Sequence, residues 1–591
     1  MIKRNMPILL IYLLLSVLSF IVFNRFMYLY SSYDTSIYEK ILLTINDLIS
    51  SLVEDPLSIS FTSQNVLIGF VGIIIIWLLF VYNNFNRKRY MPGIEHGSAT
   101  WGERKDIRHY VDKSDGSNII LTKSEKLSMS DRMKQTSIDD YNRNKNVLVI
   151  GGSGSGKTRY FVKPNIMQMH SSYVITDPKG ILIHDMGKML MDNGYKIKVF
   201  DLINRDKSDH YNPFVYLRTA DDILKLINNM ITNTNTSNKS SNDFWEKSEI
   251  AFLEAIFGFI LFEGAKEEKN IATVMDLIRL AEVKEDDENY MSVLDIMFEE
   301  LKNENPDHFA VKQYDIYKFA AGRTAKSILI SVGVRLAPFN IDSIRNIVSN
   351  DTIGLDMIGS EKTALFIIIP DTDKSFNFLA AIMYQQMFDT LVYKADHEYM
   401  GKLPYNVRCM MDEFSNIGQI PMLEILIATM RSRGISLNII LQNLSQIKSI
   451  YKDTWEIITG NCDSLLFLGG MEQTTLEYIS KMCGKTTIDN QNISQSKGEH
   501  GSYSLNDQIV GRDLITSDEV GSIKGKQCVL KIRGCNPFLS YKYPIDKHKN
   551  YKYISELYKA NWFDIEQRDS NQNKIFFSNC DVVEVFDYTA N

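Results

Sequence analysis

The amino-acid sequence predicts an α/β protein in which a parallel sheet is interrupted by an all-α inserted domain and preceded by a two-helix transmembrane anchor. Three observations predict this fold class. Two long uncharged apolar stretches lie close to the start of the chain. From residue 146 onward, short apolar runs recur that stop in polar residues or glycine, as buried parallel strands do. A long interval among these runs has apolar residues at spacings of three and four, the period of a helix.

Composition limits the class of protein. The chain has 591 residues, more than one hydrophobic core usually holds, so we expect about three structural units. Its 45% hydrophobic and 23% charged residues exclude a disordered chain or a collagen-like fibre. A net charge of −7 excludes a histone-like coat for nucleic acid, so a role with nucleic acid would need a local basic surface. The histidines and cysteines form no zinc motif or C-x-x-C pair, which favours a reducing compartment without disulfides.

The first two elements are expected to be membrane spans. Residues 5–24 carry no charge and are mainly leucine, isoleucine, valine and phenylalanine, and about 20 such residues cross a bilayer as a helix. Residues 66–82 reach the lower limit of spanning length. The alternatives are a cleaved signal peptide for the first stretch, although no small-x-small cleavage site follows it, and a buried core helix for the second.

The flanking charges predict the orientation of this anchor. Lys3 and Arg4 precede the first span and a basic cluster at residues 87–89 follows the second, whereas the segment between the spans is mainly acidic. The positive-inside rule therefore places the N-terminus and everything after residue 87 in the cytoplasm. We expect a two-pass protein of the cell (cytoplasmic) membrane, with cytoplasmic catalytic domains and about 40 residues outside.

A phosphate-binding loop follows the first expected core strand, residues 146–150. The next residues match the P-loop pattern G-x-x-x-x-G-K-[ST]: Gly151, Gly152, Ser153, Gly154, Ser155, Gly156, Lys157 and Thr158. The glycines let the backbone turn tightly, so that its N–H groups point at phosphate. Lys157 would reach the β- and γ-phosphates of a nucleoside triphosphate, and Thr158 would ligate Mg²⁺. A helix that starts near Lys157 would direct its positive end at the phosphates.

The other half of this site is expected after the apolar run at residues 407–411. Asp412 and Glu413 follow this run directly. Asp412 would hold Mg²⁺, directly or through water, and Glu413 would polarise the attacking water as a general base. The alternative is an ordinary strand end with solvated acids. The interval between Thr158 and Asp412 is long for one compact P-loop core, which implies an inserted domain.

Other apolar runs are expected to join the same sheet. They lie at residues 173–176, 195–200, 364–369, 437–441 and 464–468. Ligands of open α/β sheets bind at the carboxyl ends of the strands. Gln442, which follows one of these runs, is thus placed to sense the γ-phosphate or to orient water, unless it is only a polar residue of a turn.

The inserted domain is expected to be all-α and to form a lid or cap on the nucleotide-binding core. It begins with a low-complexity segment, residues 232–242. A helix from Ile250 to Phe262 has apolar residues on most of its faces, which predicts burial. More helices are expected near residues 271–281, 291–301 and 320–336.

These features predict four segments along the chain. They are a transmembrane anchor at 1–90, a P-loop nucleotide-binding domain at 91–231 and 352–563, an all-α inserted domain at 232–351 and an acidic tail at 564–591. The tail is rich in asparagine, glutamine and serine. It is either a solvated, partly disordered end or a docking site for a basic partner.

Taken together and in this order, the motifs resemble the type IV secretion coupling proteins of the TraG/TraD type, the membrane ATPases of conjugation. Apart from the two spans and the P-loop, the resemblance rests on several short segments. They are residues 96–102 (HGSATWG), 176–180 (TDPKG), 212–214 (NPF), 244–245 (FW), 412–414 (DEF), 431–434 (RSRG), 442–446 (QNLSQ) and 512–520 (RDLITSDEV). The resemblance covers nearly the whole chain except the outer loop and the tail.

The resemblance implies a RecA-like core and a homo-hexameric ring with ATP and Mg²⁺ at the subunit interfaces. It also implies transport of relaxase-bound single-stranded DNA, or of effector proteins, to a type IV secretion channel at the cytoplasmic membrane. In such rings an arginine of the neighbouring subunit stabilises charge on the transferring phosphate. Arg431 and Arg433 are the candidates from their place in the family pattern, although each is equally consistent with a plain surface residue. Lys179 is a further candidate for phosphate contact.

Two other functions remain open from the sequence. An FtsK-like chromosome pump would carry a C-terminal winged-helix module and usually more spans, and the sequence has neither. A substrate-docking receptor would use ATP mainly for assembly, so that the motor activity belongs to another protein. The sequence has no RNP, zinc-finger or helix-turn-helix signature. A ring that tracks DNA would need only a basic pore lining.

Overall fold

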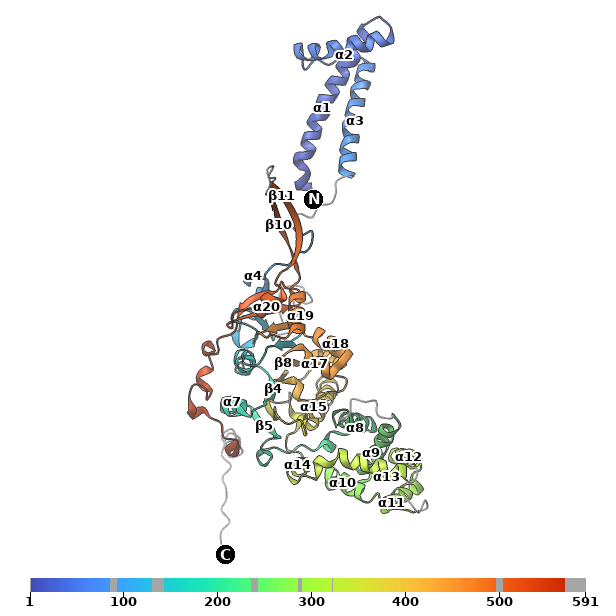
Figure 1. Ribbon diagram of the computed structural model, residues 1–591, viewed down its shortest axis with the longest axis vertical. Helices are drawn as coiled ribbons and strands as arrows, with labels where there is room; N and C mark the ends of the chain where they lie inside the picture. The colour runs from blue at the N-terminus through green and yellow to red at the C-terminus, as the bar shows by residue number, and fades with distance from the viewer. Residues whose placement is uncertain are drawn as a thin grey trace. The chain divides into compact units, whose positions relative to one another are not determined.

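The computed structural model describes residues 2–85, 93–129, 143–234, 243–284, 290–320, 323–495 and 503–568. Contacts between Cα atoms divide the chain into two compact units, residues 1–95 and 96–591 (Figure 1). The first unit contains the two apolar helices that the sequence predicts. The second contains the sheet together with the inserted helices.

The N-terminal unit consists of α1 (Ile2–Ser32), α2 (Ile37–Glu54) and α3 (Ser63–Phe85). Helices α1 and α3 pack against each other, and a Cβ atom at Gly69 would lie only 2.6 Å from the Phe20 ring. Two stretches, Leu10–Ser32 and Ser63–Tyr82, are long and apolar enough to cross a membrane. The segment between them, expected only as a loop, contains the helix α2.

Helix α1 continues beyond residue 24, the expected end of the first span, because its polar residues have partners inside the unit. Asn24 donates from Nδ2 to the Ser60 carbonyl at 3.0 Å and accepts from the Ser60 amide at 2.9 Å. Arg25 donates to the Asp55 carbonyl at 2.5 Å. Both side chains are buried, so the apolar helix extends to Ser32 without a break.

The second unit is built on one mixed nine-stranded sheet with the strand order β13-β12-β9-β3-β8-β7-β4-β6-β5. The strands are β3 (Val147–Ile150), β4 (Ser172–Thr176), β5 (Lys196–Asp201), β6 (Thr363–Ile368), β7 (Val407–Met411), β8 (Ile435–Leu441), β9 (Ser464–Phe467), β12 (Gln527–Ile532) and β13 (Phe538–Tyr541). The predicted apolar runs are the parallel strands from β9 to β5. Strands β12 and β13, which the sequence analysis missed, add antiparallel at the β9 edge.

Both faces of the sheet are buried, which explains why its strands are continuous apolar runs. Leu148 and Ile150 of β3 pack on one face, and Val147 and Val149 pack on the other. The first face is covered by α8 (Ala220–Thr234), α15 (Asn377–His397), α16 (Leu423–Thr429), α17 (Leu444–Tyr451), α18 (Trp455–Gly460) and α19 (Gln473–Cys483). The second face is covered by α6 (Lys163–Ile166), α7 (Ile181–Asp192) and the C-terminal segment that follows β13.

The described residues of the inserted part, 232–234, 243–284, 290–320 and 323–351, form helices joined by turns and loops and contain no strand. Its helices are α9 (Asp243–Glu263), α10 (Ile271–Arg279), α11 (Val293–Glu304), α12 (Phe309–Lys318), α13 (Arg323–Arg335) and α14 (Asp342–Ile347). Helix α9 is central, and its Phe252, Leu253 and Phe257 are fully buried. Helix α8 continues to Thr234, so the low-complexity segment expected from residue 232 begins within a helix. The apolar core of the insertion is continuous with one sheet face, and its boundaries at 232 and 351 stay a prediction.

Two pairs of strands lie outside the main sheet, and the sequence analysis predicted neither. Strand β1 (Asn118–Ile120) pairs with β2 (Lys126–Ser128), and β10 (Lys485–Gln495) pairs with β11 (Tyr503–Asp513) in a long hairpin. The HGSATWG segment lies along β10 through a bridge between Ser98 and Thr486. Short helices α4 (Arg104–Ile107) and α20 (Ser517–Gly521) lie close to these elements in the chain.

The first residues of the expected acidic tail pack on the sheet domain. Ile565 is buried, and Arg568 forms a bidentate ion pair with Asp209 at 2.8 and 2.9 Å. The packed part of the chain therefore extends past residue 564. The rest of the tail, residues 569–591, lies outside the described residues.

Candidate nucleotide-binding site

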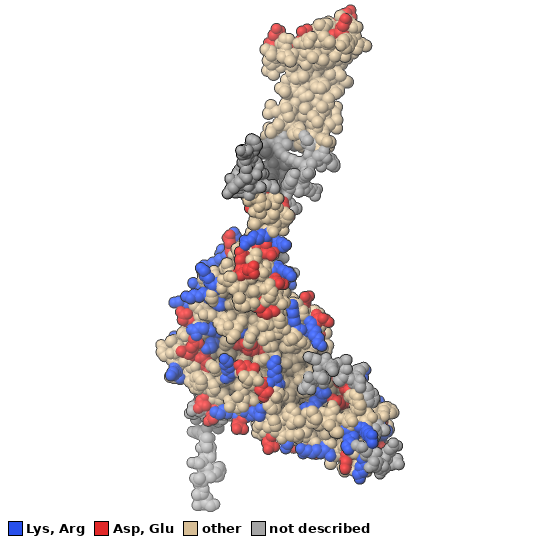
Figure 2. All heavy atoms as spheres, viewed as in Figure 1, with Lys and Arg blue, Asp and Glu red and all other residues tan. Residues whose placement is uncertain are grey.

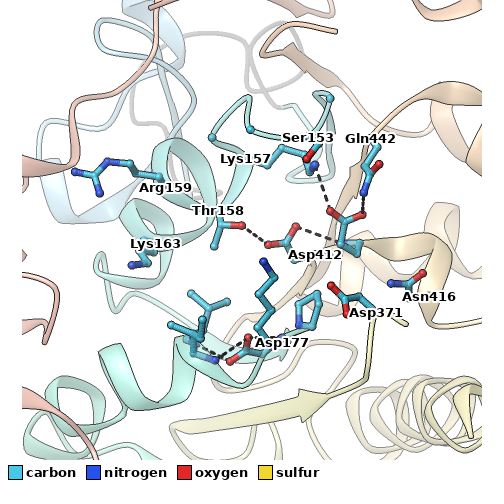
Figure 3. A pocket seen from close by; sticks show the side chains of 18 of the residues that line it. Ser153, Lys157, Thr158, Arg159, Lys163, Asp177, Asp371, Asp412, Asn416 and Gln442 are labelled. Atoms are coloured by element: carbon cyan, nitrogen blue, oxygen red, sulfur yellow. Dashed lines mark hydrogen bonds and ion pairs between the residues drawn. The ribbon is translucent and has the colours of Figure 1, made fainter. Parts of the chain in front are cut away.

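A cavity of about 610 Å³ lies at the carboxyl edge of the parallel strands (Figure 3). Its walls are the P-loop after β3 and side chains that follow β4, β6, β7 and β8. Most of the predicted site residues line it: Gly152, Ser153, Gly154, Gly156, Lys157, Thr158, Asp412, Glu413 and Gln442. They converge because the carboxyl ends of parallel strands meet at one edge of a sheet.

The P-loop has the backbone conformation that its glycines permit. Gly154 and Gly156 have φ angles of 75° and 86°, a region that residues with a side chain rarely adopt. The amide of Gly151 donates to the Leu441 carbonyl at 3.0 Å, which ties the start of the loop to the end of β8. Gly151 and Ser155, the two predicted loop residues that do not line the cavity, thus belong to its supporting backbone.

The P-loop is also supported from the C-terminal segment, which no sequence pattern indicated. Lys542 donates from Nζ to the Ser155 carbonyl at 2.9 Å. This side chain is buried, and burial lowers the pKa of its ammonium group. The helix after the loop begins with a π-helical turn, Thr158–Val162, a rare geometry that is frequent at functional sites.

The ammonium group of Lys157 contacts both halves of the site. Its Nζ donates to the Gly151 carbonyl at 2.9 Å and lies 3.3 Å from Oε1 of Glu413 (Figure 3). Lys157 is 7% exposed, so the carboxylate compensates a nearly buried cation. The P-loop lysine and the acid after β7 are therefore in direct contact.

Thr158 and Asp412 form the second contact across the cavity. The Thr158 hydroxyl donates to Oδ2 of Asp412 at 2.6 Å. Burial raises the pKa of the Asp412 carboxyl to about 6, the nearby Glu413 charge adds to this, and the Thr158 hydrogen bond opposes it. This pair presents a hydroxyl and a carboxylate to the same point of the cavity.

Glu413 is held in one orientation by its backbone and by Gln442. Its φ angle is 50°, in the left-handed region that few residues other than glycine adopt. Its amide donates to Oδ1 of Asp412 at 3.1 Å, and Gln442 donates from Nε2 to Oε2 of Glu413 at 3.0 Å. Backbone strain of this kind is typical of functional sites. Gln442 is thus in contact with Glu413, and its role toward the γ-phosphate or water stays a prediction.

The donor set fits a nucleoside triphosphate with Mg²⁺. Mg²⁺ is usually bound by one or two protein oxygens, waters and substrate phosphates, and Thr158 and Asp412 supply two such oxygens 2.6 Å apart. No cluster of three His, Cys, Asp or Glu side chains that would hold a metal alone occurs in the described part of the chain. Lys157 and the loop amides provide the positive charge that phosphates need.

Asp177 and Lys179 of the TDPKG segment line the cavity beside the P-loop. Asp177 accepts hydrogen bonds from the amides of Leu182 and Ile181 at 2.6 and 3.2 Å, which caps the start of α7. Burial raises the pKa of this carboxyl, while the backbone hydrogen bonds lower it. Lys179 thus lies within the cavity, where the resemblance placed it.

Four further charged residues line the cavity and were not predicted from the sequence: Arg159, Lys163, Asp371 and Glu556. Glu556 lies in the C-terminal segment and forms ion pairs with Arg159 and with Lys163, the latter at 2.8 Å. Lys163 also contacts Asp185 of α7 at 2.7 Å. Arg159, next to the P-loop in the chain, and Asp371, just after the apolar run at residues 364–369, had positions that could have indicated the site.

Arg431 and Arg433 do not line this cavity. Both arginines precede β8, whereas Gln442 follows it. The seven residues of the strand therefore separate the arginines from Gln442 by about 23 Å. Arg433 forms a bidentate contact with Asp396 at 2.8 and 2.6 Å. One chain therefore does not bring either arginine to its own cavity, and their role in a neighbouring subunit stays a prediction.

Solved structures share this fold. The conjugative coupling protein TrwBdeltaN70 in its unbound monoclinic form has a TM-score of 0.55 at 14% identity, over 78% of this chain and 95% of that chain. The plasmid coupling protein TrwB in complex with ADP and Mg²⁺ has a TM-score of 0.53 at 14% identity, over 77% and 95%. The fold and the site together define a P-loop nucleotide-binding protein with a RecA-like core, as expected.

Within this class, the chain belongs to the family described as Type IV secretory system Conjugative DNA transfer, whose model matches residues 102–561. The conjugal transfer protein TraG of Escherichia coli is 24% identical over 451 residues, which cover 72% of this chain and 70% of that protein. The protein VirD4 of Rhizobium radiobacter is 22% identical over 399 residues, which cover 66% and 55%. The resemblance to type IV secretion coupling proteins is therefore confirmed.

Proposed function

We propose that this protein is a membrane-anchored ATPase that couples ATP hydrolysis to the recruitment and translocation of a relaxase–DNA substrate into a type IV secretion channel. The observation that carries the proposal is the convergence of Lys157, Thr158, Asp412 and Glu413 on one cavity. Membership of the conjugative DNA transfer family supports the choice of substrate. The structure of TrwB with the ATP analogue ADPNP, which has the same fold, supports ATP as the nucleotide.

Five side chains of the cavity have a task in the proposed reaction. ATP with Mg²⁺ would supply the phosphoanhydride whose hydrolysis releases free energy for transport. Lys157 would neutralise charge on the β- and γ-phosphates, and Thr158 and Asp412 would hold the metal. Glu413, oriented by Gln442, would accept a proton from the attacking water at its carboxylate.

The working state is proposed to be a ring, a homo-hexamer, in which each cavity lies against a neighbouring subunit. The position of Arg431 and Arg433 at the opposite edge of the sheet supports action in trans, because neither lines the cavity of its own chain. An arginine at the transferring phosphate typically contributes a factor of about 10³–10⁵ to the rate. Arg431→Ala and Arg433→Ala variants, each mixed with Lys157→Ala chains, would identify the residue that acts in trans.

The membrane is proposed as the site of action. The stretches Leu10–Ser32 and Ser63–Tyr82 support a two-pass anchor, because both are long and apolar enough to span. The basic cluster at residues 87–89 lies outside the described residues and supports the orientation through its sequence alone. The N-terminus, the sheet domain and the proposed all-α lid at 232–351 would then be cytoplasmic.

Two variants test the proposal. Lys157→Ala and Glu413→Gln are each expected to abolish ATP hydrolysis stimulated by single-stranded DNA, and conjugative transfer of a plasmid that encodes its own relaxase. Binding of the relaxosome to the full-length protein in detergent should remain. The matched control is Glu300→Gln on an exposed face of α11, which should leave all three measurements unchanged.

The same experiment separates the proposal from its alternative. If transfer persists at the normal level while hydrolysis is lost, the protein is a docking receptor, and the proposal that its ATP hydrolysis drives translocation is wrong. Binding of DNA to the full chain should weaken steeply as salt rises, because contacts with phosphate release counterions. Absent or salt-insensitive binding would contradict a DNA-tracking pore.

A further inference from the structure

Helix α2, which joins the two apolar helices, separates apolar from polar side chains around its circumference. Ile41, Ile45, Ile49 and Val53 follow one another at a spacing of four and form one stripe, on which Ile49 is 72% and Val53 75% exposed. The opposite side carries mainly charged residues, Lys40, Asp47 and Glu54, together with Leu43, and Glu39, Asn46 and Ser50 lie between the two sides. An exposed apolar stripe of this length marks an interaction surface.

The lengths of the neighbouring helices place α2 at one surface of a membrane. At 1.5 Å per residue, Leu10–Ser32 and Ser63–Tyr82 are about 34 and 30 Å long. The hydrocarbon core of a bilayer is about 30 Å thick. Ser32 and Ser63 would therefore leave the core at the same surface, and α2 begins at Ile37, within a few residues of Ser32.

Hydrogen bonds hold the end of α2 back against the side of α1. The segment after α2 contacts Asn24 and Arg25 through the carbonyls of Ser60 and Asp55. Asn24 and Arg25 lie about 10–12 Å before the end of α1 at Ser32. These contacts lie on the membrane side of Ser32, the end of α1. The C-terminal end of α2 is therefore held near the membrane surface and does not project into water.

The charges of this unit agree with such a position. Figure 2 shows acidic side chains at the end formed by α2, and no charged side chain on the visible face of the described parts of α1 and α3. Helices α1 and α3 also expose apolar side chains, among them Leu14 and Leu78, which are 69% and 62% exposed. The lipid around α1 and α3 would therefore lie next to the stripe on α2.

We propose that α2 is an interfacial helix that inserts its apolar stripe into the outer lipid leaflet. The occupant of the stripe is the boundary between acyl chains and headgroups, where amphipathic helices of this kind bury their apolar face. The polar side of α2 is mainly acidic, so apolar burial drives the contact without attraction to anionic lipid. The inference rests on the membrane anchor of the proposed function.

The test uses single-cysteine substitutions in the full-length chain in intact cells. Ile45→Cys and Ile49→Cys probe the stripe, and Asp47→Cys and Glu54→Cys probe exposed positions on the opposite side of the same helix. A membrane-impermeant maleimide reports access from outside. The six native cysteines all lie at or after Cys409, on the cytoplasmic side of the anchor, and should not react.

We expect Ile45→Cys and Ile49→Cys to react at least ten times more slowly than Asp47→Cys and Glu54→Cys. All four should react equally in detergent with urea. Equal rates in intact cells would overturn the inference. The measurement is repeated with the purified chain in phosphatidylethanolamine–phosphatidylglycerol vesicles. Loss of protection there would also overturn it, because a protein partner in the cell then covers the stripe.

Failure of the proposed anchor gives a different result. If Asp47→Cys and Glu54→Cys react only after the membrane is permeabilised, the orientation of the anchor is wrong. If Ile45→Cys and Ile49→Cys still react more slowly than the other two variants in those permeabilised cells, α2 is an interfacial helix but does not bind the outer leaflet. A wrong anchor orientation therefore changes the reaction of the cysteines on the polar side, whereas a stripe that does not bind lipid changes the reaction of the cysteines on the stripe.

Discussion

Nζ of Lys157 and Oε1 of Glu413 lie 3.3 Å apart, and Oε2 of the same glutamate accepts a hydrogen bond from Gln442 at 3.0 Å. One carboxylate is therefore held from both sides, by the P-loop cation and by the amide that follows β8. A phosphate that contacts Lys157 competes with Glu413 for this cation. We expect nucleotide binding to free Glu413 from its ion pair, so that it becomes a base only when substrate is present.

Gln442→Ala is expected to lower kcat for ATP hydrolysis about 10- to 100-fold and to change nucleotide affinity less than about threefold. The reason is that Gln442 orients Glu413 but does not hold the P-loop. Steady-state hydrolysis and titration with a fluorescent ATP analogue measure the two effects. Gln473→Ala removes an exposed glutamine that contacts Glu477, and it serves as control. An equal loss of affinity would show that Gln442 contributes to binding instead.

The affinity for nucleotide with Mg²⁺ is expected to fall as the pH drops below about 6. Burial raises the pKa of the Asp412 carboxyl to about 6, and only the ionised form ligates the metal. Below the pKa, protons compete with Mg²⁺, so affinity should decrease up to about tenfold per pH unit. Binding of ADP from pH 5 to 8, with Mg²⁺ and with EDTA, measures the effect.

Asp412→Asn is the matched variant for this pH dependence. It should bind ADP with Mg²⁺ weakly at every pH, because the amide carries no charge to titrate. A flat profile for the unmodified protein between pH 5 and 8 would contradict the assignment of Asp412 as a metal ligand.

Lys542→Met is expected to weaken nucleotide binding about 3- to 10-fold. The Nζ of Lys542 donates to the Ser155 carbonyl at 2.9 Å, and a charge-assisted hydrogen bond contributes about 1.5–3 kcal/mol, part of which positions the loop. Methionine keeps the apolar stem of the side chain. Lys547→Met, at an exposed position of the same segment, should have no effect. Unchanged affinity for ADP in calorimetry would show that the loop holds its shape without this contact.

Glu254→Gln is expected to stabilise the inserted helices above pH 7. Glu254 is 3% exposed on α9, Oε1 has no hydrogen-bond partner among the described residues, and burial raises the pKa of its carboxyl from 4.5 to about 7. Because the folded pKa is raised, stability is greatest below pH 4.5 and is lost as the pH rises through 7. At pH 8 the substitution should raise the free energy of unfolding by about 1–3 kcal/mol.

Thermal or urea unfolding of this variant at pH 8 and at pH 4.5 provides the comparison. The gain should largely disappear at pH 4.5, where the glutamate itself is protonated in the folded state. A gain of equal size at both pH values would mean that the amide finds a new partner, and the pKa argument would be wrong.

The parallel strands could be predicted from sequence because both faces of the sheet are buried. Each of these strands is then a continuous apolar run, and such runs are visible without knowledge of their neighbours. Strand β13 was missed because it alternates, with Leu539 and Tyr541 exposed between buried residues. The β10–β11 hairpin was missed because its residues are largely polar, and only pairing along the whole hairpin makes them strands.

The stripe on α2 was visible in the sequence as a spacing of four, but the segment was expected only as a loop. The spacing by itself does not say whether such a helix packs on protein or on lipid. The hydrogen bonds of Asn24 and Arg25, which place the end of α2 against α1, involve residues about 30 positions or more apart in the chain.

The sequence by itself determined the P-loop, the acids after β7 and the two apolar helices, because each is a local pattern with a local physical cause. Only the tertiary structure decided that Lys542 and Glu556 support the same cavity, and that Arg431 and Arg433 lie away from it. These contacts join positions hundreds of residues apart, through side chains that carry no pattern of their own. Burial and charge pairing, which select such contacts, act between neighbours in space, so they become visible only once the chain is folded.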